Sequence, residues 1–88
     1  MNKSKRYLVV LDFTFKDNNG ELINQRRYLA GVYLTEILSK LPPAITLLQE
    51  EASVFTSEKI AEACALFLDE NKDLWYTYPC KVSILQLL

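Results

Sequence analysis

The stretch RYLVVLDFTFKDNNGELINQRRYLA, residues 6–30, decides the fold of this chain. In residues 6–16 the side chains of one face are all apolar or aromatic, which predicts a β-strand. Asn19-Gly20 follows, and both residue types tolerate the positive φ values of tight hairpin turns. Residues 21–30 predict the returning strand, so the chain is expected to contain an N-terminal antiparallel hairpin.

Two registers of this hairpin agree with the pattern. A two-residue loop at Asn19-Gly20 places Asp12 opposite Arg27, and the two side chains are then expected to pair across the strands. A three-residue loop with a bulge instead places Phe15 opposite Ile23. A shift of one residue changes which side chains share a face, so the two registers place different residues of the returning strand beside the apolar face of the first strand.

The rest of the chain predicts helices and further strands. Residues 32–41 have helical apolar spacing before Pro42-Pro43, although they could also extend the strand. Residues 44–49 predict a short third strand. A helix is expected over 57–71, with Thr56 as its N-cap and a hydrophobic staple between Phe55 and Ile60.

The C-terminal residues after Pro79 predict a final strand, because Val82 and Ile84 alternate with polar residues. Residues 1–88 are therefore expected to form one α+β domain. Its small antiparallel sheet comprises the N-terminal hairpin and the C-terminal strand, with one or two helices packed on one face.

Composition argues against several functional classes. The net charge is −1, whereas nucleic-acid-binding domains usually carry a basic excess. Residues 1–40 carry a net charge of +3, and residues 41–88 carry −4. No uncharged run approaches the length of a membrane span, and no signal-peptide pattern is present, so a cytoplasmic location is expected.

The residues that usually carry out catalysis are scarce. There is no histidine, and the two glycines, Gly20 and Gly31, do not form a phosphate-binding loop. Cys64 and Cys80 have neither the spacing of a zinc site nor a neighbouring base, and we interpret both as core residues. We therefore expect no catalytic residues, no metal and no cofactor, and a protein that is not an enzyme.

Two groups of side chains remain as candidate contact sites. Trp75, Tyr76 and Tyr78 lie in a predicted loop, and Trp and Tyr are enriched among the residues that contribute most to protein interfaces. The second group is expected to converge on the hairpin as a surface for single-stranded nucleic acid, and it comprises Arg6, Arg26, Arg27 and Tyr28.

The segment EASVFTSEKIAEAC, residues 51–64, with the helix and strand that follow it, resembles the C-terminal part of small uncharacterised phage and prophage accessory proteins. The resemblance covers less than half of the chain and implies no activity. It implies a mobile-element product that binds and inhibits a host or defence protein.

The sequence therefore predicts a protein-interaction module that binds a partner protein and can form a homo-oligomer through an unpaired strand edge. The alternative is a single-stranded nucleic-acid-binding protein that uses the hairpin face. No contact with a membrane is expected.

Overall fold

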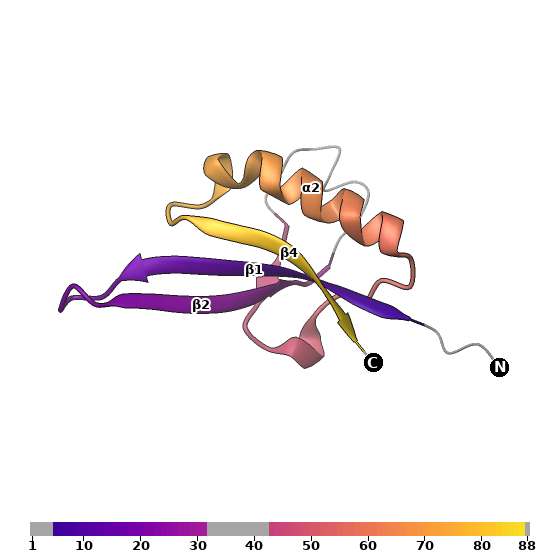
Figure 1. The fold of residues 1–88 in the computed structure, drawn as a ribbon, viewed down its shortest axis with the longest axis horizontal. Coiled ribbons are helices and arrows are strands. Elements are labelled where there is room, and N and C mark those ends of the chain that lie inside the picture. The colour runs from indigo at the N-terminus through magenta and orange to yellow at the C-terminus, as the bar shows by residue number, and fades with distance from the viewer. Residues whose placement is uncertain (1–4, 32–42, 88) are drawn as a thin grey trace.

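A computed structural model describes residues 5–31 and 43–87 of the chain, and these residues form a four-stranded antiparallel sheet covered on one face by a helix (Figure 1). The order of the strands in the sheet is β3-β2-β1-β4. The elements are β1 (Arg6–Lys16), β2 (Leu22–Leu29), β3 (Ile45–Thr46), the 3-10 turn η1 (Gln49–Glu51), α2 (Glu58–Trp75) and β4 (Cys80–Leu87). This arrangement confirms the predicted α+β class, the N-terminal hairpin and the C-terminal strand.

The hairpin adopts the three-residue loop with a bulge. Phe15 lies opposite Ile23, and the N–H of Gly20 donates to the carbonyl oxygen of Asp17 at 3.0 Å. The Asp17 carboxylate also accepts from the backbone N–H groups of Asn19 and Glu21, both at 2.9 Å. Gly20 has a φ of 81°, which L-residues with a side chain rarely adopt, so glycine suits the bulge position.

This register places Asp12 opposite Arg26, and the predicted pairing of Asp12 with Arg27 is therefore wrong. Arg26 Nε donates to Asp12 Oδ1 at 2.8 Å, and Arg26 Nη2 donates to Asp12 Oδ2 at 3.3 Å. Arg27 lies on the opposite face of β2, because successive side chains of a strand alternate.

The main core lies between the sheet and α2. Side chains of β1 and α2 are brought together there because the apolar face of β1 meets the helical positions that recur every three or four residues. The buried members of this core are Tyr7, Val9, Leu11, Phe13, Leu29, Ala61, Cys64, Leu68 and Cys80.

The opposite face of the sheet is also buried near the start of β1. Leu8, Val10 and Tyr28 form a second cluster, against which Ala52, Leu85 and Leu87 pack. Ala52 lies in the segment that follows η1, and Figure 1 shows η1 away from α2, whereas β3 is an edge strand of the sheet. This segment explains why β1 is buried on both faces here and becomes polar only toward the turn.

The predicted boundaries of the later elements need correction. The N-cap of α2 is Ser57, whose hydroxyl accepts from the N–H of Ile60 at 3.3 Å, and the prediction of Thr56 is wrong. Phe55 exchanges two backbone hydrogen bonds with Tyr7 of β1, at 2.8 and 2.9 Å, so its backbone extends the sheet and the helix begins later. Ile60 is 57% exposed, and the Phe55–Ile60 staple is therefore not formed.

Two further predictions concern the length of elements. The helix extends to Trp75 rather than ending at 71, and the third strand, expected over 44–49, comprises only Ile45–Thr46. The third strand is short because η1 follows it and turns the chain across the sheet. The expected helix over 32–41 lies outside the described residues.

Candidate aromatic pocket beside the hairpin

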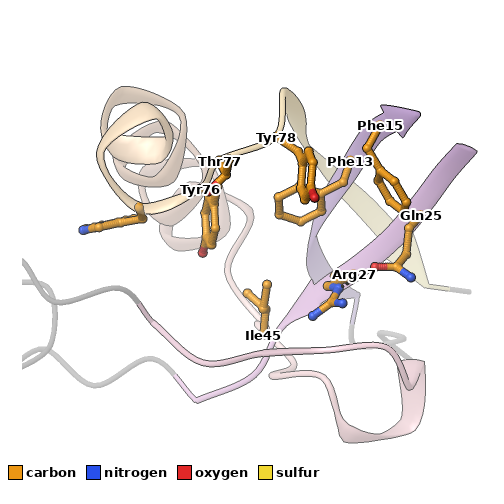
Figure 2. A pocket seen from close by; sticks show the side chains of 9 residues that line it. Phe13, Phe15, Gln25, Arg27, Ile45, Tyr76, Thr77 and Tyr78 are labelled. Atoms are coloured by element: carbon orange, nitrogen blue, oxygen red, sulfur yellow. Dashed lines mark hydrogen bonds between the residues drawn. The ribbon is translucent and has the colours of Figure 1, made fainter. Parts of the chain in front are cut away.

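A pocket of about 400 Å³ lies between the hairpin and the C-terminal end of α2 (Figure 2). The hairpin extends past this end of the helix (Figure 1). The strands, the end of the helix and the connector to β4 all contribute side chains to its walls. The residues that line it are Phe13, Phe15, Gln25, Arg27, Ile45, Trp75, Tyr76, Thr77 and Tyr78. We refer to it as the aromatic pocket.

The aromatic side chains of the pocket form pairs between β1 and the connector that follows α2. Phe13 and Tyr76 meet edge to face with ring centroids 5.2 Å apart, and Phe15 and Tyr78 lie 5.1 Å apart. Such pairs contribute about 0.5–1.5 kcal/mol beyond the burial of their area. These contacts fix the connector against the hairpin, so one wall of the pocket is held in place.

The predicted aromatic loop is partly helical. Trp75 is the last residue of α2, and the N–H of Tyr76 donates to the carbonyl oxygen of Lys72 at 2.8 Å as the helix ends. The ring of Trp75 packs 5.5 Å from that of Phe67 on the same helix. Nevertheless Trp75, Tyr76 and Tyr78 all line the aromatic pocket, so the structure brings together the three side chains that the sequence selected.

Arg27 supplies the positive charge of the pocket. It lies opposite Leu11 and so points to the side of the sheet that α2 covers. Its Nε donates to Gln25 Oε1 at 2.9 Å, which orients the guanidinium and leaves the two terminal nitrogens for other acceptors. No carboxylate of residues 5–31 or 43–87 forms a salt bridge with Arg27. A half-buried arginine in this state is suited to bind an anion.

Tyr76 adds a buried polar atom to the pocket wall. Its hydroxyl is buried and has no hydrogen-bond partner among the described residues. Burial raises the pKa of Tyr76, because the phenolate would be poorly solvated there. Because the oxygen is not accessible to solvent, the unpaired hydroxyl is a cost to the stability of the fold.

The predicted basic cluster on the hairpin is not found. Arg26 and Tyr28 share one face, Arg27 lies on the other, and Arg26 is engaged with Asp12. The salt bridge to Asp12 raises the pKa of Arg26 further above its ordinary value. Arg6 lies six residues before Asp12 on β1, which corresponds to about 20 Å along a strand. The four residues therefore do not form one continuous surface.

The cysteines lie in the core, as the sequence predicted. Cys64 and Cys80 are free and buried, and burial raises the pKa of both thiols. Within the described part of the chain there is no group of three or more His, Cys, Asp or Glu side chains placed to hold a metal ion. No described helix is long and apolar enough to cross a membrane.

The sequence did not indicate Phe13, Phe15 and Gln25 as pocket residues. In the sequence, Phe13 and Phe15 are members of the apolar face of the first strand and carry no further signal. The sequence shows that the two residues are two positions apart and close to the turn. It does not show that α2 ends before it covers this part of the sheet.

Comparison with known proteins gives no relative for this chain: no family model, no curated protein and no solved structure matches it.

Proposed function

We propose that this chain is a protein-interaction module and that the aromatic pocket is its contact site. The pocket would take an apolar or aromatic side chain of a partner protein, and a neighbouring carboxylate of the partner would bind Arg27. The observation that carries this proposal is Arg27 itself. It is half-buried among aromatic rings, oriented by Gln25 and without an ion pair in the described residues.

A protein partner suits the pocket better than single-stranded nucleic acid does. A nucleic-acid strand carries a phosphate on every nucleotide and is usually bound along a positively charged groove. The pocket offers one arginine, Arg26 is neutralised by Asp12 on the other face, and the net charge of the chain is −1. One carboxylate beside an apolar side chain matches the single charge of the pocket.

The resemblance of residues 51–64 to phage accessory proteins adds a biological expectation to this proposal. The partner would then be a host or defence protein, and binding would inhibit it. The absence of a catalytic role likewise remains a prediction from the sequence, which contains no histidine.

The proposal can be tested by selecting displayed random peptides on the full chain, with counter-selection on the Arg27→Gln variant. We expect the enriched peptides to share an aromatic or large apolar residue next to Asp or Glu. Calorimetry with the best peptide should show roughly ten- to a hundredfold weaker binding to Arg27→Gln, the range expected for a hydrogen bond to a charged group.

The matched control is Arg26→Gln, because Arg26 lies on the opposite face of the same strand and should leave peptide affinity unchanged. Peptides without an acidic residue, or equal losses for the two variants, would contradict the proposal. Binding of labelled oligo-dT that depends on salt and on both arginines would instead support the nucleic-acid alternative.

A further inference from the structure

The outer edge of β4 is a second surface with unused binding groups, and it shares no residue with the aromatic pocket. The N–H and carbonyl groups of a strand point alternately to its two sides. The N–H of Thr14 on β1 donates to the carbonyl oxygen of Pro79 at 3.0 Å. Odd-numbered residues of β4 therefore direct their backbone groups toward β1, and even-numbered residues direct theirs outward.

The outward-pointing backbone groups of β4 differ in whether they have a hydrogen-bond partner. At the start of β4, Lys72 Nζ donates to the carbonyl oxygen of Cys80 at 2.9 Å and closes the edge there. Further along, the backbone groups of Val82, Ile84 and Gln86 have no partner among the described residues. An unpaired edge of this kind accepts an additional strand, as in peptide recognition by β-augmentation.

The charged side chains beside this edge belong to α2. Lys72 reaches the edge from α2, so it marks the side of the helix that lies over the edge. Helix positions three, four and seven residues apart share a side, and on this side Asp69 Oδ1 forms a salt bridge with Lys72 Nζ at 2.9 Å. The exposed residues Glu58, Glu62 and Asp73 share this side and form no salt bridge within the described residues, and we call them the acidic flank.

We propose that the edge of β4 binds an extended, basic segment of a partner protein as a fifth strand. The backbone of Val82, Ile84 and Gln86 would bind the segment, and its Lys or Arg side chains on the helix side would meet the acidic flank. On the other face, half-buried Leu85 and Leu87 favour apolar side chains. The segment would therefore alternate basic and apolar residues.

A second copy of the chain is a poorer occupant of this edge. Antiparallel pairing of two β4 strands about a twofold axis normal to the sheet places both helices on the same side. The two acidic flanks would then face each other, and like charges in that arrangement oppose association. A basic segment has the complementary charge.

The test uses the isotope-labelled full chain and an acetylated, amidated heptapeptide that alternates lysine and valine. At saturating peptide, hydrogen exchange at the N–H groups of Val82, Ile84 and Gln86 should slow by about tenfold or more, the effect of one hydrogen bond of ordinary strength. Exchange at Ser83 and Leu85 should not change, because their N–H groups already bond to β1. The matched peptide with glutamate in place of lysine should not bind.

Two variants with matched controls separate the backbone from the charge. Gln86→Pro removes one outward N–H from an exposed position and should weaken binding by about tenfold, whereas Gln86→Ala should not. Glu62→Gln should weaken binding roughly two- to fivefold, the range of an exposed ion pair. Glu50→Gln, in η1 after β3 at the opposite edge of the sheet, should have no effect.

Equal binding of the lysine and glutamate peptides would overturn the proposal, as would slower exchange at Ser83 and Leu85 instead of the even-numbered residues. Hydrogen exchange at the edge N–H groups could also become slower as the protein concentration rises in the absence of peptide. That result would overturn the proposal and would identify a second copy of the chain as the occupant. None of these results depends on Arg27, so the aromatic pocket is tested separately.

Discussion

Replacing Tyr76 with Phe is expected to stabilise the fold, although most substitutions of buried residues destabilise. The hydroxyl of Tyr76 is buried without a hydrogen-bond partner in the described residues, and burial raises its pKa. Both observations mean that folding removes water from this hydroxyl without replacing the lost hydrogen bond. The Tyr76→Phe substitution removes the hydroxyl and keeps the ring that packs 5.2 Å from Phe13.

The expected size of the effect follows from the cost of an unpaired buried polar group, about 1–3 kcal/mol. Taking the lower end, the free energy of unfolding should rise by about 1 kcal/mol. For a domain of this size, that change corresponds to an increase in the melting temperature of roughly 4–8 °C.

Urea unfolding followed by the fluorescence of Trp75 measures this change, because Trp75 is the sole tryptophan and its ring lies 6.4 Å from that of Tyr76. Tyr78→Phe is the control: Tyr78 is 55% exposed, so its hydroxyl is hydrated and its loss should leave stability within about 0.5 kcal/mol. A lower free energy of unfolding for Tyr76→Phe would refute the reasoning, since it would show that the hydroxyl makes a stabilising hydrogen bond.

The same variant separates stability from binding. Because the hydroxyl of Tyr76 is buried and not accessible to a ligand, Tyr76→Phe should leave the affinity for the selected peptide unchanged while the melting temperature rises.

Gly20→Ala should lower the free energy of unfolding by about 1 kcal/mol in urea titrations, because the φ of 81° strains a residue with a Cβ, and Gly20→Asn should lower it less. A double-mutant cycle with Asp12→Asn and Arg26→Gln should give a coupling of about 0.2–1 kcal/mol, and a larger value would show that solvent screens this half-exposed pair less than expected. The free energy of unfolding should fall as the pH rises above about 9.0. The thiols of Cys64 and Cys80 ionise there in the unfolded chain, whereas burial keeps them protonated in the folded chain. Cys64→Ala should make the free energy of unfolding less dependent on pH in this range.

Local sequence was sufficient for the hairpin but left its register undecided. The decisive signal was present in Asp17, since Asp at the first position and Gly at the fourth are typical of a type I turn. The Asp17 carboxylate binds two backbone N–H groups of the loop and so selects the three-residue form. That choice moves Arg27 to the helix side of the sheet, and with it the positive charge of the aromatic pocket.

The pocket could be predicted only in part. The aromatic residues after the helix were recognised from their type, but their meeting with Phe13 and Arg27 depends on where α2 ends and which strands it covers. Similarly, the pattern of β1 showed one apolar face, whereas the burial of Leu8 and Val10 on the other face depends on the path of the segment around Ala52. Such contacts between distant parts of the chain are not encoded in local periodicity.

The position of β1 between β2 and β4 also governs how the chain can fold during synthesis. Its pairing with β2 is local, but Arg6 pairs with Leu87 and Val9 with Ile84, so the second ladder closes only after the last strand has left the ribosome. Until then β1 has one unpaired edge, and before α2 emerges the face of β1 that the helix covers is exposed as well. Long-range pairing of this kind folds slowly, so the exposed edge of β1 is the part of the emerging chain at greatest risk of aggregation.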